Sequence, residues 1–207
     1  MRRPELRGQP LVVGGAPEER KVVFDCSREA IQRGVQPGMS LREALSRCRE
    51  ATFVEAHHAL YHEMATAMER ALVMISPLVE PARLGQVFVG LTGLDRSYPT
   101  ELHLARAFTQ NVERAAKLKP KVGVADGKFA AYAAALFSPR GKPRLVASGE
   151  TPAFLAELSV AYLPISEEMR RRLELLGMRA IGQLAALPLG AVQAQFGLEG
   201  RLAWELA

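Results

Sequence analysis

Basic side chains at three places in this chain have the type and setting needed to contact phosphate groups. Lys128 follows the segment KVGVADG and begins an expected helix, and helix N-termini attract anions. A solvated surface lysine is the simple alternative. Further along, Arg140, Lys142 and Arg144 lie within five residues of one another. This stretch could follow a nucleic-acid backbone or be an ordinary loop.

The third group is the run of Arg170, Arg171 and Arg172 in another expected helix. Neighbouring residues on a helix diverge by about 100°, so the three side chains cannot all face the same way. We expect one or two of them, with Arg170 and Arg171 as candidates, to reach phosphates. The remainder should share a solvated face with the glutamates around them.

Histidine and cysteine give a weaker signal for metal binding. His57 and His58 are adjacent and His62 lies one turn further on, but no carboxylate or cysteine completes an obvious ligand set, although Glu63 is adjacent. The start of a surface helix explains them better. Cys26 and Cys48 are the only cysteines and have no metal-ligand spacing, so we expect two reduced thiols.

Composition places the chain among ordinary globular proteins. Of the 207 residues, 48% are hydrophobic and 24% charged, which argues against wholesale disorder. The formal net charge of +5 is compatible with nucleic acid as a partner but does not identify one. Without a long apolar run or a signal-like N-terminus, we expect a soluble, cytoplasmic protein that has no membrane contact.

The pattern of residues 9–56 predicts a small α+β unit. Strands are expected at 10–13 and, as its partner, 21–24, with a third at 52–54. A helix capped by Asp25 or Ser27 should end near Gly34. Ser40 begins a capping box for a second short helix.

Residues 57–147 show the element order helix, two strands, helix, strand. Methionines and other apolar residues share one face of a helix at 60–75, which we expect to be core. Strands at 77–84 and 87–91 should form a hairpin around Gly85-Gln86, with a primed turn because glycine comes first. A helix at 100–118 that Thr100 caps, a strand at 121–125, a helix at 128–137 and a strand at 144–147 complete an α+β layer of ferredoxin-like order. We expect this layer to lack its first strand, because the sequence starts too late to supply it.

Residues 149–207 alternate short helical segments with glycine and proline, which predicts a compact helical domain. The expected helices are 152–158, 166–176, 181–187, 191–196 and 199 to the end. The segment 141–149 is the expected linker. Gln183-Leu184 faintly resembles a clamp-binding peptide, but its place in the helical repeat favours core packing.

The segment VEPARLGQVFVGLTG, residues 79–93, resembles the palm signature V-E-x-x-S-x-D-E-x-F-L-D-x-T-G of the Y-family (translesion) DNA polymerases. Other segments resemble the family in the same order: PELRGQPLVVGG, FDCSREAIQRGVQPGMSLREALSRC, GVADGKFAAYAA and LGMRAIGQLAALP. The resemblance implies fingers at 9–56, an incomplete ferredoxin-like palm at 57–147 and a helical thumb at 149–207, without a little finger.

Departures from the family pattern concern its catalytic machinery. The two acidic positions of the signature hold Gly85 and Gln86, which cannot replace carboxylate ligands of Mg²⁺ in phosphoryl transfer. The family's triphosphate-binding tyrosine and arginine fall on Arg28 and Ile31, and its second lysine falls on Tyr132. Lys128 remains, and with Arg28 it is the weak candidate for nucleotide or phosphate binding. The G-x-G hairpin of the thumb, which grips a DNA phosphate, is also missing.

This combination resembles the ImuB-like branch of catalytically inactive homologues in bacterial mutagenic DNA repair. The resemblance implies weak, sequence-independent DNA binding, no catalytic metal, and contacts with the sliding clamp and an error-prone polymerase. Two alternatives stay open: a fragment of an active, Mg²⁺-dependent polymerase, and a pure protein-interaction module.

A missing central strand would leave two sheet edges with unpaired backbone groups. We therefore expect rearranged strand pairing, a homodimer that fills the space, or a marginally stable palm.

Overall fold

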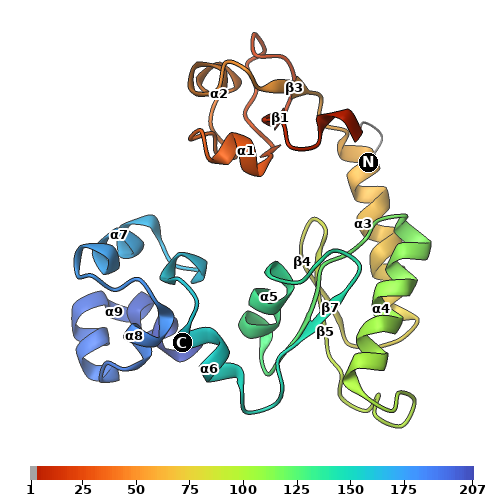
Figure 1. The fold of residues 1–207 in the computed structure, drawn as a ribbon, viewed down its shortest axis with the longest axis vertical. Helices are drawn as coiled ribbons and strands as arrows, with labels where there is room; N and C mark the ends of the chain where they lie inside the picture. Colours follow the sequence, from red (N-terminus) through yellow and green to blue (C-terminus); the bar gives the residue numbers. More distant parts are fainter. Residues whose placement is uncertain (1–3) are drawn as a thin grey trace. The chain divides into compact units, whose positions relative to one another are not determined.

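The computed structural model describes residues 4–207, and its mixture of helices and short strands confirms the predicted α+β class. The chain divides into two compact units, Met1–His62 and Glu63–Ala207 (Figure 1). Within the described residues, no helix combines the length and the apolar character that crossing a membrane requires.

The first unit is a three-stranded sheet with two short helices. After the 3-10 helix η1 (Pro4–Leu6), the sheet has the order β2-β1-β3. In it, β1 (Leu11–Val13) is antiparallel to β2 (Asp25–Cys26) and parallel to β3 (Thr52–Val54). Helices α1 (Arg28–Ile31) and α2 (Leu41–Arg47) complete the unit. Its buried core consists of Val12, Val23, Ala30, Val35, Leu41, Ala44 and Cys48.

The predicted strand at 21–24 is wrong, because β2 begins one residue after it. Val23 turns instead toward the segment before α2: its N–H donates to Met39 O at 2.8 Å, and its O accepts from Gly38 N at 2.8 Å. The backbone groups of Val23 are therefore not available to β1, and Asp25–Cys26 pairs with β1 instead.

Side-chain caps fix both helices of this unit, as the sequence predicts. Ser27 Oγ accepts from Ala30 N at 3.4 Å, and Ser40 Oγ accepts from Glu43 N at 3.1 Å. The reciprocal half of the capping box at Ser40 does not form, because the Glu43 carboxylate pairs with Arg47 at 2.9 Å.

The second unit begins within α3 (His58–Val73), which leads into the hairpin of β4 (Val79–Arg83) and β5 (Gln86–Val89). Buried Ser76 joins the two: its hydroxyl donates to Gly90 O at 2.7 Å and accepts from Leu78 N at 3.1 Å. Helix α4 (Glu101–Ala116), capped by Thr100 as predicted, packs on the same hairpin. The buried residues of this cluster are Leu72, Leu104, Phe108 and Val112.

The face of α3 is less buried than its pattern predicts. Among its described residues only Leu72 is buried, and Met64 and Met68 are half-buried. The reason is the width of the sheet beneath it, since only the two strands of the hairpin cover this face.

The hairpin forms where expected, but its turn differs. Arg83 lies opposite Gln86, so the loop is Leu84-Gly85 and not Gly85-Gln86, and a bulge lies between Pro81 and Arg83. Gly85 has φ 76°, whereas Leu84 does not have a positive φ. A primed turn needs a positive φ at the first loop residue, so that prediction is wrong. Glycine at the second position supplies the left-handed conformation instead.

The remaining strands form a separate parallel pair, β6 (Val122–Val124) with β7 (Pro143–Leu145), joined by α5 (Lys128–Leu136). The segment 141–149 is therefore not the free linker that we expected, because β7 lies within it. Helix α5 packs very closely on β6 at Gly123, where an added Cβ would lie 2.2 Å from Ala131 O and 2.3 Å from Ala135 N.

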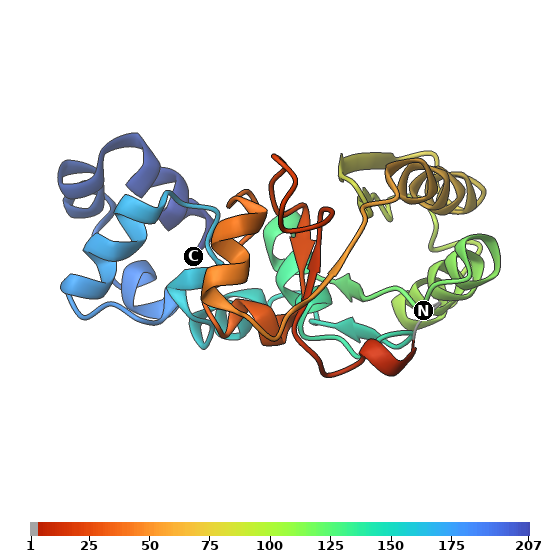
Figure 2. The same cartoon turned by 90° about the horizontal axis from the view of Figure 1, so that it is seen from above.

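The helix-strand-strand-helix-strand order is thus confirmed, but it does not make one sheet. Within residues 4–207, no backbone pairing joins β4–β5 to β6–β7, and Figure 2 shows the two pairs as separate ribbons. The expected rearrangement of strand pairing does not occur. Helix α4 provides a common support, because it contacts β6 and β7 as well as packing on the hairpin.

The C-terminal part of the second unit is helical, as predicted. It contains α6 (Thr151–Ala156), the 3-10 helix η2 (Val160–Tyr162), α7 (Glu167–Leu175), α8 (Ile181–Ala185) and α9 (Leu189–Leu206). Gly197, with φ 64° and ψ −149°, kinks α9 between the two helices expected there. The buried core includes Leu155, Leu163, Leu173, Ile181 and Leu184, and Ala130 and Ala133 of α5 belong to the same cluster.

Replacing Gly123 by alanine tests the close packing of α5 on β6. The added methyl group meets backbone atoms that cannot rotate away, so we expect a loss of about 1–3 kcal/mol or more in the free energy of unfolding, measured by urea denaturation. Gly190→Ala is the matched control, because its Cβ meets nothing within 4 Å and Gly190 lies in a helix. Equal stability of the two variants would contradict the packing.

Cys48 is a probe of opening in the first unit. It is 1% exposed, and burial raises the pKa of its thiol above the ordinary 9.0. In a Cys26→Ser variant at pH 7, we expect labelling by a disulfide reagent only through opening of the fold. Because the folded state keeps the thiol protonated, this unit should also lose stability as the pH rises past 9.0. Rapid labelling without denaturant would contradict both.

Candidate functional site

The candidate site lies where the β4–β5 hairpin faces the first turns of α5. The hairpin contributes Glu80, Arg83, Gln86 and Phe88, and α5 contributes Lys128 and Tyr132. Lys128 is the first residue of its helix and Tyr132 lies one turn later, so their side chains leave α5 on the same side. The site therefore joins the two separate strand pairs through side chains.

Lys128 forms an ion pair with Glu80. Its Nζ lies 2.7 Å from Glu80 Oε1 and 2.5 Å from Oε2, and 5.9 Å from the centre of the Phe88 ring. Both side chains are about 60% exposed (61% and 62%), so the pair contributes little to stability. Its main effect is on charge, because the carboxylate compensates the ammonium.

Arg83 is held by two neutral partners. Its Nε donates to Gln86 Oε1, and its Nη2 donates to Tyr132 Oη at 3.0 Å. The guanidinium carbon lies 5.5 Å from the centre of the Tyr132 ring. Gln86 and Tyr132 fix the direction of the guanidinium without cancelling its charge.

The side chains at this hairpin do not fit a catalytic magnesium site. Mg²⁺ requires near-octahedral oxygen ligands and is usually held by carboxylates. Gly85, at the tip, has no side chain, Gln86 already accepts from Arg83, and Glu80 is paired with Lys128. Throughout residues 4–207, no three histidine, cysteine or acidic side chains come together as a metal site would require.

Asp126 and the three histidines near the start of α3 make contacts only with nearby elements or are exposed. Asp126 accepts from Ser148 Oγ at 3.0 Å and from Gly149 N at 3.3 Å, and so ties the turn before α5 to the segment after β7. His57, His58 and His62 are exposed at the start of α3, as expected for a surface helix. The His58 ring contacts Phe24 edge-on, with a centroid distance of 4.7 Å.

Arg28 and Lys128, the two residues expected to contact a nucleotide or phosphate, lie in different units. Arg28 is exposed at the start of α1, and Ile31, in the same helix, is 52% exposed. Among the described residues of the first unit, no ion pair gives Arg28 a defined orientation toward a ligand. Its role stays a prediction.

The basic stretch after α5 is not one surface loop. Arg140 and Lys142 are exposed in the turn before β7, whereas Arg144 lies in β7. The guanidinium of Arg144 lies 5.1 Å from the centre of the Phe154 ring. Strand geometry and this aromatic contact hold Arg144 in place. In the described part of the chain, Arg140 and Lys142 have neither an aromatic contact of this kind nor an ion pair.

The three arginines of α7 diverge, as helix geometry predicts. Arg170 pairs with Glu167, and Arg172 donates to Gln195 O at 2.7 Å. Arg171 is exposed and has no ion pair within the part of the chain that the structure describes. Of the predicted pair, Arg171 is therefore the freer side chain for a phosphate.

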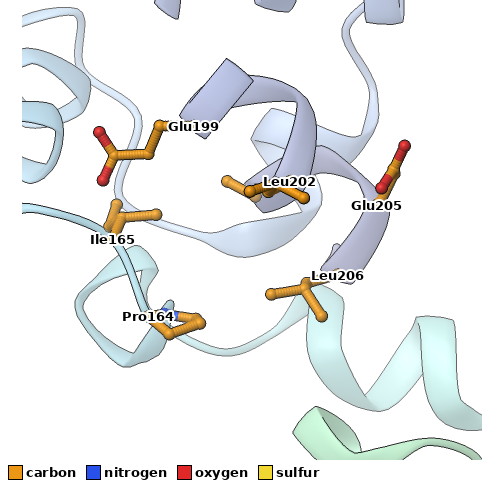
Figure 3. A pocket seen from close by; sticks show the side chains of 7 residues that line it. Pro164, Ile165, Glu199, Leu202, Glu205 and Leu206 are labelled. Carbon is orange, nitrogen blue, oxygen red and sulfur yellow. The ribbon is translucent and has the colours of Figure 1, made fainter. Parts of the chain in front are cut away.

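An apolar groove lies between the start of α7 and the end of α9 (Figure 3). It encloses about 280 Å³, and its lining residues are Pro164, Ile165, Glu199, Leu202, Ala203, Glu205 and Leu206. Glu199 accepts from Ser166 Oγ at 2.9 Å, and Glu205 accepts from Arg201 Nε at 2.8 Å. Both carboxylates therefore have partners in the same chain, and the groove offers no free catalytic group.

Sequence reasoning missed Arg83 as a site residue and Glu80 as the partner of Lys128. The available signal was the hairpin itself, because a two-residue loop at Leu84-Gly85 puts Arg83 opposite Gln86. The contact with Tyr132 could not be read from the sequence, since 49 residues separate it from Arg83. In the clamp-like pair, Leu184 is fully buried, whereas Gln183 is exposed and its side chain accepts from Arg179 N and Ala180 N.

Comparison with protein families and with named proteins gives consistent matches. The impB/mucB/samB family matches residues 1–135. A DNA polymerase IV of Dehalococcoides mccartyi strain CBDB1 is 34% identical over 199 residues, which cover 94% of this chain and 50% of the relative. A DNA polymerase IV of Pelotomaculum thermopropionicum is 30% identical over 201 residues. The chain thus spans about half the length of these relatives, 50% in each case.

Solved structures show the same fold. The crystal structure of DinB from Sulfolobus solfataricus superposes with a TM-score of 0.81 at 23% identity, over 99% of this chain and 61% of that one. An insertion ternary complex of Dbh DNA polymerase gives a TM-score of 0.75 at 22% identity, again over 99% of this chain and 61% of the other.

Tyr132→Phe tests the hydrogen bond that joins the hairpin to α5. Removing the phenol oxygen leaves Arg83 with one neutral partner, and we expect a loss of about 0.5–1 kcal/mol in the free energy of unfolding, measured by urea denaturation. Tyr162→Phe is the matched control, because within residues 4–207 its hydroxyl makes no hydrogen bond while its ring packs on Phe137. If the two variants lose equal stability, the Arg83 contact contributes nothing.

Proposed function

Because the chain belongs to the impB/mucB/samB family, we propose that it binds DNA as a Y-family polymerase-like protein of DNA repair and does not itself transfer nucleotides. The Y-family resemblance is confirmed at the level of the family. The inactive, ImuB-like assignment is the part that we propose.

One observation carries the non-catalytic part: the side chains at the hairpin where the family signature places its acids. Phosphoryl transfer by two metals needs carboxylates that hold both ions and neutralise charge on the attacking and leaving oxygens. Here Gly85 has no side chain, Gln86 binds Arg83 and Glu80 binds Lys128. The side chains of this hairpin and of α5 leave no free carboxylate for a metal.

DNA is the proposed ligand for two reasons. The relatives are named as DNA polymerases, and one similar structure is described as a ternary complex of such an enzyme. The chain also has a net charge of +5 and exposed cations, of which Arg140, Lys142 and Arg171 are examples. Contacts of this type reach backbone phosphates, so binding should be independent of base sequence and should weaken with salt.

An active DNA-directed DNA polymerase is the alternative, and the 34% identity to a DNA polymerase IV favours it. In that case Mg²⁺ would be the cofactor, and carboxylates outside the site described above would have to supply its ligands. A sliding clamp, an error-prone polymerase and a second copy of this chain stay proposed partners, and a cytoplasmic location stays a prediction.

Primer extension separates the two functions. The purified chain, with a primer–template duplex, all four deoxynucleotides and Mg²⁺ or Mn²⁺, should show no template-dependent extension. The same protein should bind the duplex in fluorescence anisotropy, with an affinity that falls as NaCl rises. A DNA polymerase IV relative serves as the positive control.

Template-dependent extension that Lys128→Ala abolishes would establish an enzyme and end the proposal. Failure to bind the duplex even at low salt would instead favour a pure interaction module.

A further inference from the structure

We propose that Arg83 binds a phosphate oxyanion at the hairpin and so supplies positive charge where the family signature places metal ligands. This inference rests on the proposed function, because it names the chemical group that the non-catalytic site would take. The ligand class is a phosphate group, either from a nucleic-acid backbone or from a free diphosphate.

The charge of Arg83 is not compensated within the described part of the chain. None of the ion pairs among residues 4–207 includes it. Its two hydrogen-bond acceptors are the amide of Gln86 and the phenol of Tyr132, both neutral. A guanidinium has five N–H donors, so about three of them remain after these two bonds.

The geometry favours an oxyanion over a loose counter-ion. Hydrogen bonds from Nε and Nη2 and the contact with the Tyr132 ring restrain the plane of the guanidinium. A planar guanidinium binds phosphate through two parallel N–H···O bonds. Since Gln86 and Tyr132 already orient the side chain, less conformational entropy is lost when an anion binds.

Lys128, the residue expected from the sequence to meet a phosphate, is less suited to this task. Its ammonium lies within 2.7 Å of both carboxylate oxygens of Glu80. An incoming phosphate would have to displace this carboxylate or be repelled by it. Of the two cations at the site, Arg83 is the one whose charge is available.

Two substitutions remove the available charge in different ways. Arg83→Gln deletes the cation, whereas Gln86→Glu keeps Arg83 and gives it a carboxylate partner of nearly the same shape as the native amide. The second variant preserves the hairpin contact, so it tests the inference even if the first variant folds poorly. Arg201→Gln is the matched control, because it makes the same substitution at an exposed arginine of α9 that pairs with Glu205 and lies outside the candidate site.

Binding of a fluorescent primer–template duplex is measured by anisotropy over a series of NaCl concentrations, with EDTA present so that no metal contributes. We expect Arg83→Gln and Gln86→Glu each to weaken binding about fivefold at low salt and to reduce the salt slope by about 1. Arg201→Gln should change the affinity less than about twofold. Unchanged affinity and slope in both Arg83→Gln and Gln86→Glu, or an equal loss in Arg201→Gln, would overturn the inference.

A competition arm identifies the source of the phosphate. If pyrophosphate without metal displaces the duplex from the native chain but not from Arg83→Gln, the site takes a free diphosphate. If the Arg83 dependence appears with the duplex alone and pyrophosphate has no effect, the site takes a backbone phosphate. Neither result depends on primer extension. If the chain proved to be an active enzyme, the proposed non-catalytic function would fail, but the role of Arg83 in phosphate binding would still be tested separately.

Discussion

In residues 79–145, two strand pairs that share no backbone hydrogen bond in the described structure are connected through side chains and through a shared helix. Glu80 with Lys128, and Arg83 with Tyr132, connect the β4–β5 hairpin to α5. Helix α4 supports both pairs through apolar packing. In a continuous sheet, backbone bonds would fix this geometry regardless of side-chain identity. Here apolar packing on α4 and a few polar contacts together hold the hairpin against α5.

This arrangement explains why the side chains of the site favour an anion and do not fit a metal ion. The Glu80 carboxylate pairs with Lys128, and the Gln86 amide oxygen accepts from Arg83. The oxygen atoms that a metal would need therefore already have partners. The outcome is a guanidinium with neutral partners beside a compensated ammonium. Electrostatic attraction in such a site acts on anions, and it needs no bound ion to do so. The same residues that hold the hairpin in place therefore also determine what the site can bind.

Much of the fold follows from local patterns. Serine and threonine caps at Ser27, Ser40 and Thr100 begin helices where the sequence predicts, because capping depends on residues within one turn. The pairing of residues 21–24 and the turn at Gly85 were predicted wrongly. The first error comes from a distant partner, because the backbone of Val23 binds Met39. The second accompanies a bulge between Pro81 and Arg83, which the sequence pattern does not predict.

The sequence by itself determined the family, the α+β class, the helix starts and the loss of acids at Gly85 and Gln86, because these are properties of residue types in order along the chain. Only the tertiary structure decided that Glu80 compensates Lys128 and that Tyr132 orients Arg83, across separations of 48 and 49 residues. The physical reason is that charge compensation depends on distances of a few ångströms between side chains. Spacing along the chain does not specify those distances until the hairpin and α5 are packed.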